Sequence, residues 1–205
     1  FFKIMSNLIG IVNYGVVGNI YNIRKAVKVA EGESFLVESL SDFKKADKLI
    51  LPGVGSFKDA MEELERKGFV KPIKEFNKPI LGICLGMQIL ADVGFEYGKT
   101  KGLGLIQAEV KPIICDSQIP HMGYNTLEVL ESNPILEGVE NEEFYFMHSF
   151  EVVNYNNISA LTTYADHKFV SVLCNDNVYG VQFHPEKSRQ QGIKLFNNFI
   201  NLSND

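Results

Sequence analysis

The sequence has few cysteines and no long apolar segment. Its three cysteines, Cys84, Cys115 and Cys174, are an odd number, and their spacing is not that of a metal site. We therefore expect no metal centre, and free thiols suit a reducing, cytoplasmic compartment. No apolar run approaches the roughly 18 residues that cross a bilayer, so no contact with a membrane is predicted.

Signatures of nucleotide and nucleic-acid binding are also weak. The glycines of residues 13–19 suggest a phosphate loop, but that segment has neither G-x-G-x-x-G nor a Walker lysine. The net charge of -5 argues against a broad nucleic-acid-binding face. The sequence therefore predicts no cofactor and no nucleic-acid partner.

Length and composition are those of an ordinary globular protein. The chain has 205 residues, 45% of them hydrophobic and 22% charged, and no repeat or linker divides it. We predict one domain over residues 1–205. Residues 1–6 are interpreted as an extension, because this apolar start lacks the small-residue cleavage site of a signal peptide.

Apolar runs alternate with helix-compatible segments in the first half of the chain. Predicted strands are Leu8–Val12, Phe35–Val37, Lys48–Leu51 and Pro79–Ile83, and predicted helices cover residues 18–30, 57–67 and 87–93. The second of these helices begins after an N-cap serine, Ser56. This alternation predicts an α/β fold with a mostly parallel central sheet flanked by helices.

The second half of the chain has the pattern of an antiparallel sheet. Predicted strands are Leu105–Val110, Asn125–Leu130, Phe144–Met147, Glu151–Val153, Ser159–Thr163, Phe169–Cys174 and Val178–Gln182. We expect them to extend the central sheet as antiparallel strands. Residues 192–202 predict a closing amphipathic helix.

The most informative stretch is Gly82-Ile83-Cys84-Leu85-Gly86, between a predicted strand and a predicted helix. A G-x-C-x-G at this position is typical of a nucleophile elbow, in which a tight turn presents the reactive side chain. The start of a helix favours a thiolate, and the backbone N–H of Leu85 is placed to stabilise an oxyanion. The alternative is that Cys84 is a small buried apolar residue.

Four histidines are candidates for the base that a nucleophilic cysteine needs. His184 ends an apolar strand that Pro185 stops, and Glu186 follows, so a carboxylate can orient the imidazole. The alternative for this segment is a solvated turn. His167 is predicted to lie in a polar turn, whereas His121 and His148 are either structural or line a site.

The turn Pro52-Gly53-Val54-Gly55 follows another predicted parallel strand. Sites in such sheets lie at the carboxyl ends of the strands, so this turn, the Asn13 turn and Cys84 are expected at one rim. The glycines can bring backbone N–H groups close to a substrate, and we predict that they complete the oxyanion hole. An ordinary glycine-rich turn is the alternative.

Seven motifs together indicate a family. They are NYGVVGN (13–19), LPGVGSF (51–57), PILGICLGMQIL (79–90), GLGLI (102–106), IPHMGYNTL (119–127), FYFMHSF (144–150) and YGVQFHPEKS (179–188). With these motifs the chain resembles the class I (triad) glutamine amidotransferases over almost its whole length. Within that family it is similar to the glutaminase subunits of imidazole glycerol phosphate synthases, which act in histidine biosynthesis.

The resemblance implies a thiol mechanism. Cys84 would attack the side-chain amide of glutamine, His184 would transfer the protons, and Glu186 would orient His184. Residues implied in oxyanion or substrate binding are Gly53, Val54, Leu85, Gln88, Glu96, Ser149 and Phe150.

The resemblance also implies a partner. Ammonia would pass to a cyclase subunit of (β/α)8-barrel type in a heterodimer, docked against Asn13, Met122, Tyr124 and Lys187. Two departures fall on this face: Asn13 stands where the family usually has Asp, with one extra residue in Val16-Val17, and Tyr124 stands where Trp is common. A paralogue that supplies ammonia for sugar amidination is therefore an alternative, as are a free-standing thiol hydrolase and a non-catalytic subunit.

Overall fold

The structure is a computed structural model that describes residues 7–15 and 17–203. Residues 1–6 and Val16, which include the predicted extension and part of the first-turn insertion, lie outside the described residues. An eight-stranded sheet has the order β2-β1-β3-β4-β14-β13-β12-β9. Its strands are β1 (Leu8–Val12), β2 (Glu33–Val37), β3 (Lys48–Leu51), β4 (Ile80–Ile83), β9 (Glu128–Val129), β12 (Ile158–Tyr164), β13 (His167–Asn175) and β14 (Val178–Val181).

The sheet changes from parallel to antiparallel at β14. β1 pairs in parallel with β2 and β3, and β4 pairs in parallel with both β3 and β14. β13, β12 and β9 then add antiparallel strands to β14. The register places Leu51 beside Gly82 and Val181 beside Ile83, so β3, β4 and β14 end at the same rim.

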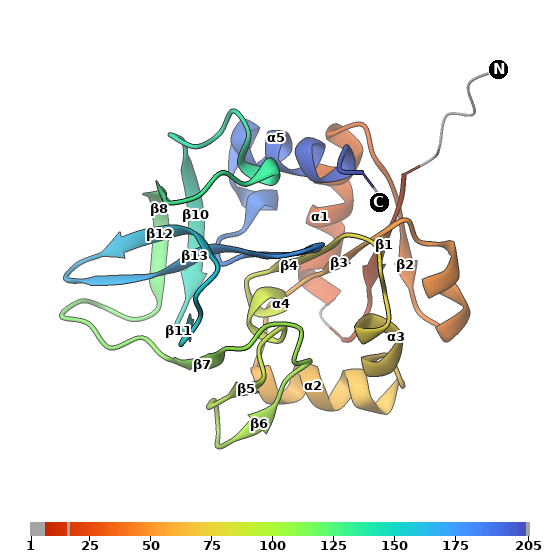
Figure 1. Ribbon diagram of the computed structural model, residues 1–205, viewed down its shortest axis with the longest axis horizontal. Coiled ribbons are helices and arrows are strands. Elements are labelled where there is room, and N and C mark those ends of the chain that lie inside the picture. Colours follow the sequence, from red (N-terminus) through yellow and green to blue (C-terminus); the bar gives the residue numbers. More distant parts are fainter. Residues whose placement is uncertain (1–6, 16, 204–205) are drawn as a thin grey trace.

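Helices cover both faces of this sheet (Figure 1). The helices are α1 (Val17–Val29), α2 (Phe57–Arg66), α3 (Val70–Lys74), α4 (Leu85–Gln88) and α5 (Arg189–Ile200). α1 and α5 lie on one face, and α2, α3 and α4 lie on the other. The apolar stripe of α2 explains its placement, because Ala60, Met61 and Leu64 recur at helical spacing and are buried. The predicted α/β class is confirmed.

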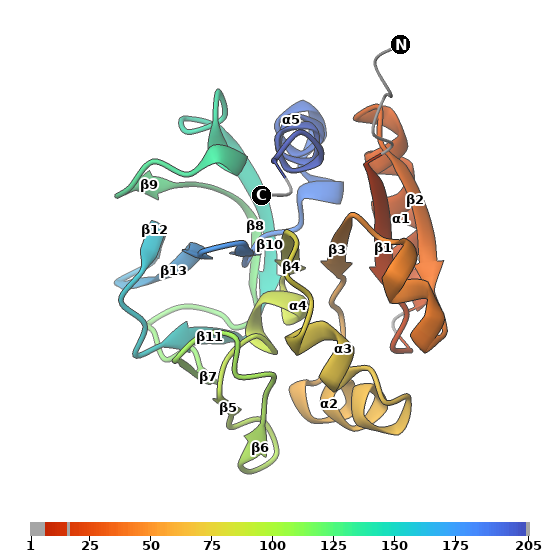
Figure 2. The same cartoon turned by 45° about the vertical axis from the view of Figure 1, so that its right-hand side comes forward.

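Two smaller sheets carry the remaining strands. One pairs β8 (His121–Thr126) with β10 (Glu143–His148), antiparallel. The other has the order β11-β7-β5-β6 and lies on the same side as α2 (Figure 2). Its strands are β5 (Val93–Gly94), β6 (Thr100–Lys101), β7 (Glu109–Pro112) and β11 (Phe150–Val153).

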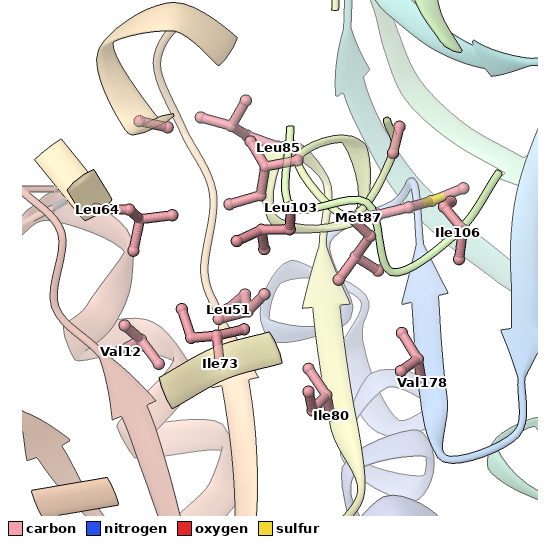
Figure 3. Close-up of a cluster of buried hydrophobic side chains, with 14 of the residues drawn as sticks. Val12, Leu51, Leu64, Ile73, Ile80, Leu85, Met87, Leu103, Ile106 and Val178 are labelled. Atoms are coloured by element: carbon pink, nitrogen blue, oxygen red, sulfur yellow. The ribbon is translucent and has the colours of Figure 1, made fainter. Parts of the chain in front are cut away.

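Apolar side chains pack on both faces of the central sheet. Figure 3 shows the cluster that joins the sheet to α2, α3 and α4, with Leu51 and Ile80 from strands, Ile73 from α3 and Leu85 and Met87 from α4. A second cluster joins the opposite face to α1, α5 and β10. The end of β4 is therefore held from two sides. No helix in the described part is long and apolar enough to cross a membrane.

The helix predicted over residues 87–93 was wrong in extent. α4 begins at Leu85 and ends at Gln88, and Val93 lies in β5. The carbonyls that would accept the next helical bonds are taken by residues 102–106: Ile89 accepts from Leu103, Leu90 from Leu105 and Ile106, and Ala91 from Gly104. Tertiary hydrogen bonds therefore end the helix after one turn.

The predicted antiparallel extension was only partly correct. β9, β12 and β13 extend the central sheet, but β7, β8, β10 and β11 belong to the smaller sheets. The run predicted as Leu105–Val110 pairs only from Glu109, and the run Asn125–Leu130 is divided between β8 and β9. His167 begins β13 and does not lie in the preceding turn, because its Nε2 bonds the buried carboxylate of Glu151 at 2.7 Å. α3 was not predicted.

Candidate active site

Cys84 occupies a sharp turn between β4 and α4. Its backbone has φ 52° and ψ -108°, a left-handed conformation that L-residues rarely adopt, and its N–H donates to the Val181 carbonyl at 2.7 Å. A Cβ on Gly86 would lie 1.9 Å from the Leu51 carbonyl oxygen, so only glycine allows α4 to approach β3 this closely. The G-x-C-x-G segment thus forms the predicted elbow.

His184 and Glu186 lie beyond the end of β14. The His184 N–H donates to the Tyr145 carbonyl at 2.8 Å, which joins this segment to β10. His184 Nδ1 lies 2.8 Å from Glu186 Oε1, and both side chains are fully buried. Among the described residues, His184 Nε2 has no hydrogen-bond partner. Because the carboxylate holds Nδ1–H, Nε2 is the nitrogen available for proton transfer.

The surroundings of His184 favour its charged form. Burial disfavours the imidazolium, but the negative charges of Cys84 and Glu186 outweigh it and raise the pKa of His184 to about 10. An imidazolium near a thiolate is the resting pair of many reactive cysteines. Since α4 has only four residues, its dipole contributes little at Cys84, and the helix-start effect expected from the sequence is small.

A cavity of about 260 Å³ opens beside these groups. Its lining includes Cys84 and His184 and all seven residues predicted for oxyanion or substrate binding: Gly53, Val54, Leu85, Gln88, Glu96, Ser149 and Phe150. Glu186 is not part of this lining and contacts His184 through Nδ1. Among the described residues, no group of three or more His, Cys, Asp and Glu side chains is placed to hold a metal ion.

The turn after β3 forms one side of the cavity. A Cβ on Gly53 would lie 2.4 Å from the Gly86 nitrogen, so the turn packs directly on the start of α4. The buried Tyr14 hydroxyl donates to the Pro52 carbonyl, and Ser56 caps α2 by accepting from Asp59 N–H at 3.1 Å. The Glu96 carboxylate accepts from Phe57 N–H at 2.7 Å. The three strand ends therefore meet at one rim, as predicted.

β10 and the residues after it form another side of the cavity. His148 Nδ1 lies 2.9 Å from the Phe150 carbonyl, which can only accept, so Nδ1 carries the proton and Nε2 is left to accept from His121 Nδ1 at 3.2 Å. Burial lowers the pKa of His148 to about 3 and that of His121 to about 4. His121 also lies 4.1 Å from the Tyr164 ring centroid. Of the two roles left open for these histidines, His148 lines the site and His121 supports it.

Gln182 was missed as a site residue. It follows β14, is fully buried, and its Nε2 lies 3.5 Å from Cys84 Sγ. The sequence signal was a single amide in an otherwise apolar strand end, two residues before His184.

Two of the predicted docking residues, Tyr124 and Lys187, contact each other beside His184, and a third lies on the strand of Tyr124. The Tyr124 hydroxyl donates to the Lys187 carbonyl at 2.9 Å. Lys187 Nζ lies 5.6 Å from the Tyr145 ring centroid, and Met122, on the same strand as Tyr124, is 58% exposed. Asn13 lies at the end of β1, where its Nδ2 donates to Glu38 Oε1 at 3.2 Å.

An elbow cysteine on a parallel sheet, with a carboxylate-oriented histidine from the next strand, defines a thiol enzyme of the triad type. The model of the family "Glutamine amidotransferase class-I" matches residues 9–202. The chain belongs to this family, and the resemblance inferred from its motifs is confirmed.

The most informative relatives have more specific names. The chain is 44% identical over 202 residues to "Imidazole glycerol phosphate synthase subunit HisH 1" of Campylobacter jejuni (strain RM1221), covering 95% of this chain and 100% of the relative. It is 42% identical over 198 residues to "Imidazole glycerol phosphate synthase subunit HisH" of Desulfitobacterium hafniense (strain DSM 10664 / DCB-2), covering 94% and 93%.

Solved structures share the fold at lower identity. A crystal structure described as glutamine amidotransferase has a TM-score of 0.74 at 19% identity, covering 95% of this chain and 99% of the other. A putative GMP synthase protein from Thermoplasma acidophilum has a TM-score of 0.73 at 24% identity, covering 94% and 92%. These two likenesses support the fold alone.

Proposed function

We propose that this chain is the glutaminase subunit of an imidazole glycerol phosphate synthase, which acts in histidine biosynthesis. It hydrolyses the side-chain amide of glutamine to glutamate and ammonia, and a partner cyclase subunit consumes the ammonia. The observation that carries the proposal is the elbow cysteine, which shares a cavity with an imidazole whose other nitrogen is held by Glu186. The relatives at about 40% identity supply the pathway.

Acylation uses the thiolate and the imidazolium. Cys84 Sγ attacks Cδ of the glutamine side chain, a C–S bond forms, and the carbonyl electrons move to the oxygen. Backbone N–H groups of Leu85 and of the Gly53–Val54 segment stabilise this oxyanion. The oxyanion then collapses, the C–N bond breaks, and His184 Nε2–H gives its proton to the departing amide nitrogen. Ammonia and a γ-glutamyl thioester result.

Deacylation restores the pair. A water attacks the thioester carbonyl while the now neutral His184 Nε2 takes one of its protons. Collapse of the second oxyanion breaks the C–S bond and releases glutamate and the Cys84 thiolate beside an imidazolium. Glu186 keeps Nδ1–H in place through both steps, so the same nitrogen gives and takes the proton.

Substrate selection falls to the rest of the cavity lining. The half-buried Glu96 carboxylate suits the α-ammonium of glutamine, and Gln88 can bind polar atoms of the amino-acid end. Ser149 and Phe150 would bind the carboxylate by hydrogen bonds. Gln88 already donates to the Phe150 carbonyl at 3.0 Å, so these two groups are fixed before substrate arrives.

The partner is a (β/α)8-barrel cyclase in a heterodimer, docked on the face that holds Met122, Tyr124 and Lys187. These residues lie next to the His184 segment, which gives ammonia a short route from the cavity into the partner. Lys187 can pair with a carboxylate of the cyclase. Asn13, at the rim where β1 ends, is assigned to the edge of this face.

Ammonia release from glutamine tests the proposal. The chain is assayed alone, then with a histidine-pathway cyclase and its nucleotide ligand, with Cys84→Ala as the inactive control. Low activity alone and a large rise in the mixture are expected. A mixture that releases no more ammonia than the chain alone contradicts the histidine-pathway assignment and favours a sugar-amidinating partner. High activity without a partner favours a free-standing hydrolase.

A further inference from the structure

Two buried glutamine amides connect the wall formed by β10 to the sulfur of Cys84. Gln182 Nε2 lies 3.5 Å from Cys84 Sγ, and Gln182 Oε1 accepts from Gln88 Nε2 at 3.1 Å. Gln88 Nε2 also donates to the Phe150 carbonyl at 3.0 Å. Gln182 is fully buried and Gln88 is 5% exposed, so solvent does not compete for these bonds.

The direction of each amide follows from its neighbours. The Phe150 carbonyl has only lone pairs, so Gln88 must present its NH₂ group there. The second hydrogen of that NH₂ group is donated to Gln182 Oε1. With its oxygen occupied in this way, Gln182 must turn its own NH₂ group toward the sulfur. The Phe150 carbonyl therefore determines, through Gln88, that Gln182 presents its NH₂ group to Cys84 Sγ.

Backbone hydrogen bonds also hold Cys84 and Gln182 in place. Cys84 N–H donates to the carbonyl of Val181, the residue before Gln182, and Gln182 N–H donates to the Ser171 carbonyl at 2.9 Å. The two residues are 98 positions apart in the sequence, yet both are held by strands of one sheet. The Gln182 side chain has little freedom to turn away from the sulfur.

We propose that Gln182 is a positioning residue for the reactive cysteine, whose amide N–H donates to Cys84 Sγ and favours the thiolate over the thiol. This inference rests on the proposed function, in which Cys84 is the nucleophile. A thiolate accepts hydrogen bonds strongly and a thiol weakly, so a fixed N–H donor stabilises mainly the charged form. The bond also orients the sulfur, whose other contact is the Met147 carbonyl oxygen at 3.8 Å, an acceptor that only the thiol form can use. His184 stays free to move protons.

Four titratable groups lie in or near the cavity that Cys84 lines. His184 and His148 line the same cavity, as does Glu96, whose carboxylate accepts from Phe57 N–H. Tyr14 is close enough for the Cys84 charge to raise its pKa further, after burial, and its hydroxyl donates to the Pro52 carbonyl. Glu186 acts through His184. Gln182 is an uncharged donor within this set, so its replacement changes hydrogen bonding without changing charge.

The test is the pH profile of Cys84 alkylation by iodoacetamide in the full-length chain, followed by peptide mass spectrometry. Gln182→Met keeps the length of the side chain and removes the donor. We expect the midpoint of the profile to rise by about one pH unit, which is about a tenfold loss of thiolate below the midpoint. Gln182→Glu places a carboxylate against the sulfur and should raise the midpoint further. Gln107→Met, at an exposed position, is the matched control.

Three outcomes overturn the inference. An unchanged midpoint with a lower melting temperature would mean that Gln182 only fills space. A lower midpoint would mean that the amide presents its oxygen to the sulfur. If the Gln182 variants do not fold, the side-chain NH₂ resonances of Gln182 are compared by NMR in the wild type and in Cys84→Ala, and no shift would also contradict it. The alkylation profile needs no glutamine, so it fails independently of the ammonia assay.

Discussion

The cavity has one wall built from parallel strand ends and another built from β10, and each wall carries a buried histidine. His184, on the first wall, has the Glu186 carboxylate at 2.8 Å and Cys84 nearby, and these partners raise its pKa to about 10. His148, on the second, has a carbonyl and another neutral histidine as partners, and burial lowers its pKa to about 3. Both are at least nine-tenths buried. Their partners, and not their depth, decide which one is charged.

This difference assigns different roles to the two walls. On the first wall, His184 lies beside the nucleophile and can give and take a proton. On the second wall, the neutral histidines His121 and His148 hold neighbouring polar groups in place by hydrogen bonds. A neutral His148 is required there, because a second imidazolium would repel His184, an effect that adds to the low pKa of His148. Substitutions on the first wall should therefore affect mainly activity, and substitutions on the second wall mainly stability.

The largest effect is expected from removing the nucleophile. Cys84→Ala should reduce ammonia release by about 10⁴-fold or more, because the covalent route is lost. It should also lower the pKa of His184, since the thiolate is one of the charges that raise it. Ammonia assays and an NMR titration of His184 measure the two effects. Cys115→Ala is the control, and residual activity equal to that of the control would contradict the assignment.

Glu186→Gln should have the next largest effect. A neutral amide can accept from Nδ1–H or donate to Nδ1, so it no longer fixes the tautomer of His184, and the imidazolium loses part of its charge stabilisation. We expect a fall in kcat of about 10²- to 10⁴-fold and a lower pKa of His184. Glu62→Gln, an exposed glutamate on α2, provides the matched control. Unaltered kcat would show that Glu186 does not orient the base.

How much of this site can be predicted from the sequence depends on how far apart along the chain the contacting residues are. The elbow, His184 and Glu186 are carried by short local motifs and by the ends of apolar runs. β1 and β3 were predicted residue for residue, because buried parallel strands are short apolar runs bounded by turns. Gln182 was missed because its one local signal, a lone amide in an apolar strand end, does not reveal a contact with a residue 98 positions away.

The sheet assignments show the same limit. Alternation locates a strand but does not specify its partner, so β8 and β10 were placed in the central sheet although they pair with each other. The length of α4 depends on carbonyls of residues 89–91 that bond to residues 102–106, which no helical periodicity reveals.

His121→Phe tests the second wall and is expected to act mainly on stability. A phenyl ring can keep the stacking on Tyr164 but cannot donate to His148. Because the folded-state pKa of each histidine is depressed, the unfolded chain binds the extra protons, and stability falls as pH drops from about 6.5 toward 4. The variant carries one such histidine fewer, so its free energy of unfolding should fall less steeply with decreasing pH, by about 1.4 kcal/mol per pH unit.

Urea unfolding of the wild type and His121→Phe between pH 7 and pH 4 measures this difference. At pH 7 the variant should lose about 1 kcal/mol for the missing hydrogen bond. Its kcat should stay within about tenfold of the wild type, since His148 still donates to the Phe150 carbonyl. If the free energies of unfolding of the two proteins changed with pH in parallel, the depressed pKa of His121 would be contradicted. A loss of kcat as large as that of Glu186→Gln would contradict the different roles of the two walls.

The smallest effect is expected at the edge of the first wall. Ser56→Ala removes the acceptor for Asp59 N–H and should destabilise the fold by about 1 kcal/mol. The shift of the urea midpoint at constant m-value measures it, with the exposed Ser41→Ala as control. A variant as stable as the control would show that the cap contributes nothing.

The central claim is that Cys84, and no other thiol, forms a covalent bond with a glutamine-derived carbon. The most direct measurement is labelling with a glutamine analogue that carries a diazoketone in place of the amide, in the chain alone and with the histidine-pathway cyclase, followed by peptide mass spectrometry. We predict one label on the peptide that contains Cys84, with protection by glutamine. Labelling of Cys115 or Cys174, or no label under either condition, would contradict the account.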